Sequence, residues 1–139
     1  MSIENKMNTQ ELCSFISYFE NIDPDKACQW KGGEKREDGV ITMPYPIYEK
    51  EFMEFVETFY KSEISLHDYQ NELNQRVPDW QTVNMNAIVE TADFELIRAI
   101  LTKCIRVERF CDGAWDSSIR SGLFLDILRR LNTVCQPPL

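Results

Sequence analysis

The chain has 139 residues, a hydrophobic share of 43% and five scattered cysteines, which together fit one globular domain spanning 1–139. No run of about 18 apolar residues predicts a membrane span, and the N-terminus shows neither an apolar signal core nor a basic leader. An odd cysteine count without a C-x-x-C pair, beside a single histidine, argues against a disulfide framework and a metal site. The expectation is a cytoplasmic protein with no metal, no cofactor and no membrane contact.

The net charge of −8 is placed in the first half of the chain. Residues 1–72 carry 15 acidic and 7 basic side chains, whereas residues 73–139 carry 8 of each. Binding to a phosphate backbone needs clustered lysine and arginine, so nucleic acid is not expected as a partner. An acidic half serves solubility, or it covers a basic partner.

The first 48 residues predict one helix and one hairpin. Asn8 and Glu11 resemble a capping box before an apolar helical stripe, which ends at Pro24. That stripe consists of Leu12, Phe15, Ile16 and Phe19. Turn signals at Gly32-Gly33 and Asp38-Gly39 then favour a short hairpin that pairs 27–30 with 40–43. Pro44 and Pro46 are expected to end its second strand.

Apolar stripes at helical spacing predict the remaining elements. They place helices over about 47–61, 66–75 and 93–108, a turn or two within 80–90, a short helix over 113–120, and a final helix after Gly122. Four glutamates in the 47–61 helix flank its apolar stripe as a solvated face, and the lone His67 is expected at the surface. The predicted fold class is mainly α: a compact multi-helix single domain with one short β-hairpin at about 27–45.

The segment 106–122, RVERFCDGAWDSSIRSG, is the densest in chemically capable side chains. Continuing the buried stripe of the 93–108 helix puts Glu108 on the apolar side, where its carboxylate must find a partner. An arginine, or the amides at the start of the 113–120 helix, would serve. Asp112 is expected to cap that helix, and Gly113 to allow the tight turn before it.

Two interpretations of this segment remain open. In the favoured one, Glu108, Asp112 and an arginine join two helices at a corner, with Trp115 packed behind them. In the other, the same region is a polar ligand pocket, whose candidate residues are Arg106, Glu108, Arg109, Asp112 and Trp115. No nucleophile elbow, phosphate loop or metal-ligand spacing is present, so no catalytic residue is assigned.

Two motifs carry a resemblance over about residues 27–131: D-G-x-x-x-M-P-Y from Asp38 to Tyr45 and E-R-F-x-D-G from Glu108 to Gly113. The chain resembles a family of small bacterial cytosolic proteins of unknown function, and similar segments are expected beside ADP-ribose-processing modules. The resemblance implies no established activity. Its architectural positions are Trp30, Gly39, Pro44, Tyr45, Gly113 and Gly122.

Three functions follow from these observations. The leading one is a non-enzymatic binding or accessory module that acts on a protein or small-molecule partner. The second is a ligand-binding or enzymatic domain that uses the polar Glu/Arg/Asp pocket for a nucleotide-like anion. The third is an acidic antitoxin or immunity-type protein.

Overall fold

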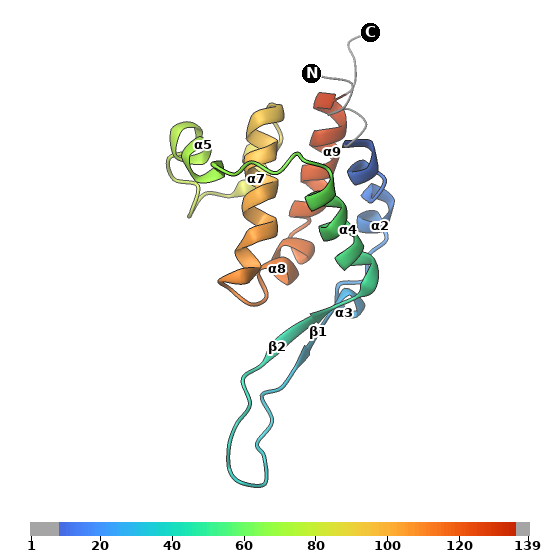
Figure 1. Cartoon of the computed structure of the whole chain (residues 1–139), viewed down its shortest axis with the longest axis vertical. Coiled ribbons are helices and arrows are strands. Elements are labelled where there is room, and N and C mark those ends of the chain that lie inside the picture. The colour runs from blue at the N-terminus through green and yellow to red at the C-terminus, as the bar shows by residue number, and fades with distance from the viewer. Residues whose placement is uncertain (1–8, 136–139) are drawn as a thin grey trace.

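The computed structural model describes residues 9–135, which form a helical body and one projecting β-hairpin (Figure 1). The helices are α2 (Ile16–Glu20), α3 (Pro24–Ala27), α4 (Lys50–Lys61), α5 (Tyr69–Arg76), α6 (Met85–Val89), α7 (Phe94–Arg106), α8 (Ala114–Arg120) and α9 (Leu123–Cys135), with a 3-10 turn η1 (Val107–Arg109) after α7. Strands β1 (Cys28–Lys31) and β2 (Tyr45–Tyr48) pair antiparallel. The predicted mainly α fold with a single two-stranded sheet is confirmed for the described residues.

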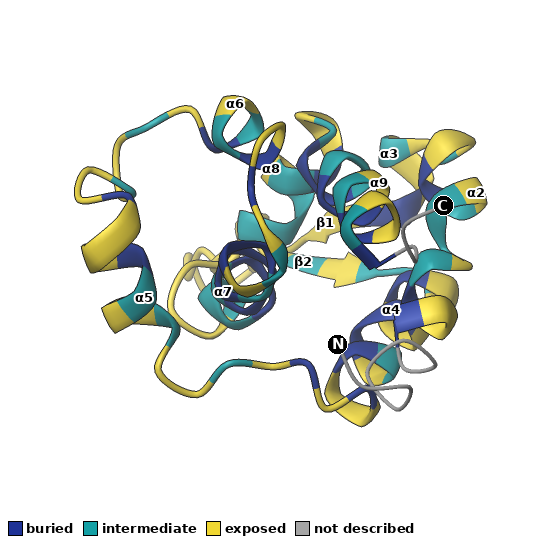
Figure 2. Ribbon diagram, turned by 90° about the horizontal axis from the view of Figure 1, so that it is seen from above, coloured by how far each residue is buried: buried dark blue, intermediate teal, exposed yellow. Residues whose placement is uncertain are grey.

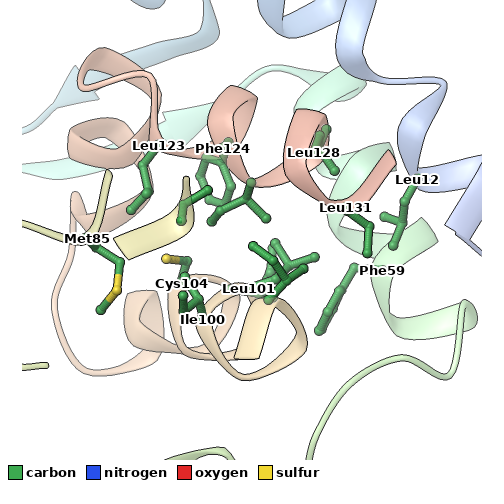
Figure 3. Packing of buried hydrophobic residues seen from close by; sticks show 14 of the residues in the cluster. Leu12, Phe59, Met85, Ile100, Leu101, Cys104, Leu123, Phe124, Leu128 and Leu131 are labelled. Atoms are coloured by element: carbon green, nitrogen blue, oxygen red, sulfur yellow. The ribbon is translucent and has the colours of Figure 1, made fainter. Parts of the chain in front are cut away.

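Helix α7 lies at the centre of the body, between α5 and α9 (Figure 2). It begins at Asp93, whose side chain accepts the Leu96 amide at 3.0 Å, so the carboxylate stabilises the positive end of the helix. Its predicted stripe is buried and meets the apolar side of α9, where Leu123, Phe124, Leu128 and Leu131 point inward (Figure 3). No helix in the described part is long and apolar enough to cross a membrane.

Helix α4 supplies an aromatic layer to the same core. Its predicted stripe of Phe52, Phe55, Val56 and Phe59 is buried. The Phe19 ring lies 5.0 Å from that of Phe55 and 5.7 Å from that of Phe124, measured between centroids, so α2, α4 and α9 share one cluster of rings. Burial of such large rings is a main source of the stability of a domain this size.

The N-terminal helical region is divided more finely than its single apolar stripe suggests. Residues 9–13 and α2 are separate helical pieces with a turn at Ser14 and Phe15 between them. Pro24 begins α3, because proline suits the first helical position and Asp23 accepts the Asp25 amide as the cap. The capping role expected of Asn8 lies outside the described residues.

The hairpin differs from the expectation in its second strand. The predicted partner segment 40–43 lies near the tip, and β2 follows it at Tyr45–Tyr48 with Trp30 opposite Pro46. The Glu49 amide bonds the Ala27 carbonyl at 2.8 Å, so the alternating ladder leaves Trp30 and Pro46 as a non-hydrogen-bonded pair. Pro46 therefore loses no ladder bond, and the expectation that it ends the strand was wrong.

Beyond the strands, the two arms stay paired toward the tip. Gly33 and Thr42 share a hydrogen bond of 2.7 Å, and Lys35 lies opposite Ile41 as an isolated bridge. Gly32 has a φ of +84°, and a Cβ there would lie 2.5 Å from the Met43 carbonyl oxygen, so only glycine fits this crossing of the arms. The hairpin consequently reaches far from the helical body (Figure 1).

Candidate functional site

Glu108 occupies the turn η1 and caps α8. Its Oε2 accepts the Gly113 amide at 2.8 Å, and its Oε1 accepts the Trp115 amide at the same distance. The prediction that Glu108 bonds the amides at the start of this helix is confirmed. The side chain is half-buried rather than mostly buried, and no arginine bonds it among the described residues.

Asp112 does not cap α8, and that expectation was wrong. The capping position is taken by Gly113, whose φ of +91° lies in the left-handed region, and Asp112 is exposed. This backbone turns the first amides of α8 back toward η1, where the Glu108 carboxylate already lies. Glu108, five residues before Gly113, therefore caps the helix in place of Asp112.

Tyr48 of β2 joins the same carboxylate to the hairpin. Its hydroxyl donates to Glu108 Oε1 at 3.0 Å and accepts the Asp116 amide at 3.1 Å. Burial raises the pKa of the Tyr48 phenol, and the neighbouring Glu108 carboxylate adds to that effect. The phenol therefore stays a donor at neutral pH. Sequence spacing missed Tyr48, because it lies 60 positions before Glu108 and its own position was assigned to the start of the predicted 47–61 helix.

Trp30 completes the joint from β1. Its Nε1 donates to Asp116 Oδ2 at 3.2 Å, and its ring rests on Gly113, where a Cβ would lie 2.6 Å from Trp30 Cζ2. We name Trp30, Tyr48, Glu108, Gly113 and Asp116 the hairpin anchor. Each member links the base of the hairpin to the corner between α7 and α8.

Two further residues support the hairpin anchor. Arg120 bonds Asp116 and Asp25, each at 2.9 Å, and so ties α8 to α3 just before β1. Trp115 donates from Nε1 to the Ile105 carbonyl at 2.9 Å and packs its ring against Tyr48 and Phe52 at centroid distances of 5.2 and 5.3 Å. Glu108 and Trp115 thus take part in a corner as expected, but Asp112 does not. The arginine at this corner, Arg120, bonds Asp116 rather than Glu108.

The remaining architectural residues lie along the hairpin and at the end of α8. Gly39 has a φ of +85° in the turn at the tip, and Gly122 has a φ of +76° directly after α8. A Cβ at Gly33 would lie 3.4 Å from Cγ of Pro44 across the hairpin, and Tyr45 begins β2 as an exposed residue. Three of the four therefore serve turns or the crossing of the arms, while Tyr45 presents its ring to solvent.

The candidate pocket residues divide into two groups. Glu108 and Trp115 belong to the corner, whereas Arg106 and Arg109 line a separate cavity of about 270 Å³ together with His67 and Phe110. Asp112 lines neither. A single polar pocket that combines the five residues is therefore not formed.

The cysteines and the acidic side chains of the described residues were expected to form neither disulfides nor a metal site. No group of three or more histidine, cysteine, aspartate or glutamate side chains within 9–135 is arranged to hold a metal ion. All five cysteines are free, and burial raises the pKa of the Cys104 thiol to about 11. Burial also raises the pKa of Cys28, which lies opposite Tyr48 in the hairpin, and this disfavours its thiolate at neutral pH.

The fold and the site define a small, mainly α protein whose hairpin is held at its base by hydrogen bonds to the helical body. The chain belongs to a family of unknown function (DUF6508), whose family model matches residues 4–136. Searches among curated proteins and among solved structures found no significant match.

Proposed function

We propose that this chain is a non-enzymatic binding module that docks onto a partner protein through its hairpin. The observation that carries the proposal is the concentration of exposed apolar side chains on this one element. Six of the nine large hydrophobic residues that the described part exposes lie between positions 30 and 47: Trp30, Val40, Ile41, Met43, Tyr45 and Ile47. Clusters of this kind on an otherwise polar surface mark interaction sites.

The two arms of the hairpin differ in chemistry. The arm before the turn carries the charged Lys31, Glu34, Lys35 and Arg36, whereas the arm after it carries five of the six exposed apolar residues, with Ile41 66% and Met43 82% exposed. A partner that fits offers an apolar groove for the second arm, with polar groups at its rim. Aromatic and methionine side chains are enriched at such interfaces.

The hairpin anchor supports the proposal on energetic grounds. A two-stranded hairpin alone is only marginally stable in water, so a free arm would have to be ordered on binding. Here Tyr48, Trp30 and the capped start of α8 hold its base before any partner arrives. The proposal includes a bacterial cytosolic setting. Five free thiols fit a reducing compartment, where cysteines usually stay unpaired.

Site-specific photo-crosslinking in the native host tests the proposal. A crosslinking residue at Ile41 or Met43 is expected to capture the same protein, and one at the exposed Met53 of α4 is expected not to. With that protein purified, Ile41→Ser combined with Met43→Ser should weaken the affinity about tenfold or more, because several apolar contacts are lost. The melting midpoint should stay unchanged.

Salt separates this proposal from docking through the acidic surface. Apolar docking should change little between low and high salt, whereas binding by exposed carboxylates would weaken steeply. A Glu51→Gln, Glu54→Gln variant on α4 serves as the matched control and should bind normally. Equal capture at all three crosslinking positions, or an affinity that the serine variant leaves unchanged, would overturn the proposal. Capture of only a second copy of this chain would replace the partner by self-association.

A further inference from the structure

A second surface of the molecule is chemically distinct from the hairpin. The cavity of about 270 Å³ lies where α5 begins and where α7 and η1 end. Two arginines, Arg106 and Arg109, reach it from the C-terminal side of α7, and Asp68, Tyr69 and Gln70 border it from the start of α5. It shares no lining residue with the hairpin anchor.

The partners of the guanidinium groups distinguish Arg106 and Arg109 from the other arginines, all eight of which lie in the described part of the chain. Five of the eight are paired with a carboxylate, namely Arg36, Arg76, Arg98, Arg120 and Arg129. Arg130 donates to the Ala92 carbonyl at 2.7 Å. Arg106 and Arg109 contact phenol groups instead, and both line the cavity at the start of α5.

Contact with a phenol leaves a guanidinium available for an anion. The Arg106 guanidinium lies over the Tyr69 ring at 5.8 Å from its centroid, which engages the face of the group and leaves its N–H edges for a ligand. Arg109 contacts the Tyr60 hydroxyl with one nitrogen at 3.5 Å. Arginine edges match the oxygens of phosphate two at a time, which makes such a pair a good phosphate site.

The start of α5 adds to the positive field of the cavity. Asp68 precedes the helix but makes no capping hydrogen bond with its side chain, so the positive end of α5 is left uncapped by it. Among the described residues that line the cavity, Asp68 supplies one carboxylate, whereas Arg106 and Arg109 supply two guanidinium groups. In a chain of net charge −8, a cationic cavity is a local exception that calls for a negative ligand.

Phe110 adds an apolar ring to the cavity. Its side chain is 86% exposed, the largest exposed fraction among the big apolar side chains described. Within the segment 108–113, Glu108 and Gly113 hold α8 in place, whereas Arg109 and Phe110 have no such structural contact and line the cavity. An exposed ring beside guanidinium groups offers a stacking surface for a flat ligand.

We infer that this cavity binds a small phosphate monoester that carries a flat ring, a class that includes the nucleoside monophosphates. Arg106 and Arg109 bind the phosphate, and Phe110 stacks on the ring. Ligand cavities usually measure about 300 to 1,000 Å³. This cavity of about 270 Å³ lies just below that range, so it suits one phosphate and one ring system rather than a dinucleotide. This inference is independent of the hairpin and of any partner protein.

Titrations followed by amide chemical shifts test the inference with three probes: AMP, adenosine and inorganic phosphate. AMP should bind saturably, with a Kd of about 1 mM or tighter, and should shift the amides of 67–70 and 106–110. Arg106→Gln combined with Arg109→Gln should weaken AMP binding about tenfold or more, because charge-assisted hydrogen bonds are lost. Arg36→Gln, which alters an arginine of the hairpin, should bind AMP as the unmodified chain does.

The two halves of the ligand are tested separately. Phe110→Ser should weaken AMP binding severalfold and leave phosphate binding unchanged, since only the ring loses its stacking partner. Adenosine should bind more weakly than AMP in the unmodified chain. The inference is overturned if AMP shifts none of these amides, if the double glutamine variant binds AMP unchanged, or if phosphate alone binds as tightly as AMP.

Discussion

Glu108 shows at the scale of one residue how the sequence and the structure relate. Helical periodicity predicts the inward phase of Glu108, and the orphan amides of the next helix predict its partners, because both depend on neighbouring positions. The Tyr48 hydroxyl at 3.0 Å could not be predicted, since a contact across 60 positions depends on how the hairpin is mounted. Local spacing likewise favoured Asp112 as the cap, and the left-handed backbone of Gly113 decided otherwise.

The three hydrogen bonds of Glu108 predict a large loss of stability on truncation. Glu108→Ala leaves two α8 amides and the Tyr48 hydroxyl without their acceptor, so the free energy of unfolding should fall by about 2–3 kcal/mol. Glu108→Gln should cost less, about 1 kcal/mol, because an amide oxygen still accepts. Urea unfolding measures both, with the exposed Glu57→Ala of α4 as the control.

A fall of less than about 0.5 kcal/mol for Glu108→Ala, the range of ordinary surface changes, would show that the corner does not depend on this cap.

At the scale of elements, the periodic helices were predictable and the hairpin register was not. Helices α4, α7 and α9 each bury one stripe at 3.6-residue spacing, and a pattern of that kind is readable without knowledge of the fold. The second strand was placed five residues early, because Pro44 and Pro46 were taken to end it. A strand accepts a proline only at a position whose backbone nitrogen points away from the partner strand. Hydrogen-bonded and non-hydrogen-bonded pairs alternate, and the register with the partner strand decides which positions these are.

The packing of β1 on the start of α8 predicts a marked difference between two glycines. Gly113→Ala combines a φ of +91° with a Cβ 2.6 Å from the Trp30 ring, so the indole must move away from the start of α8. Gly122→Ala has a φ of +76° and nothing within 4 Å, so it carries only the cost of the left-handed backbone, about 1 kcal/mol. Gly113→Ala should cost at least about 1 kcal/mol more than that.

Urea unfolding of the two variants, with tryptophan fluorescence as a second readout, checks this difference. Trp30 should become more solvent-exposed in Gly113→Ala and keep its emission in Gly122→Ala. Equal stability losses in the two variants would contradict the contact between the hairpin and α8.

At the scale of the whole molecule, most of the hairpin lies apart from the core. The core draws on residues from Leu12 to Cys135, whereas nothing between Cys28 and Phe52 belongs to its fully buried set. Composition and stripes predict such a core well, because burial follows side-chain chemistry. They do not predict how far a segment projects, which follows from the arrangement of the elements around it.

This separation predicts the course of limited proteolysis. Trypsin should cut first after Lys35 or Arg36 at the hairpin tip, where the chain is exposed and lacks core contacts. The two fragments should remain associated and keep their helical circular dichroism, because both contribute to one core. Mass spectrometry identifies the cut, and gel filtration follows the association. An earlier cut at the exposed Lys61, or fragments that separate without denaturant, would contradict the prediction.

Pro46 also bears on how copies of this chain behave when crowded together. A lone pair of strands has two open edges, and an open edge invites a strand from another molecule to add to it, which is a common route to aggregation. On the outer edge of β2, an added strand would have to accept a hydrogen bond from the backbone nitrogen at position 46. Pro46 has no amide hydrogen and cannot donate that bond. Sheet growth is blocked there, so an arm rich in exposed apolar side chains can remain available for side-chain recognition without seeding fibrils.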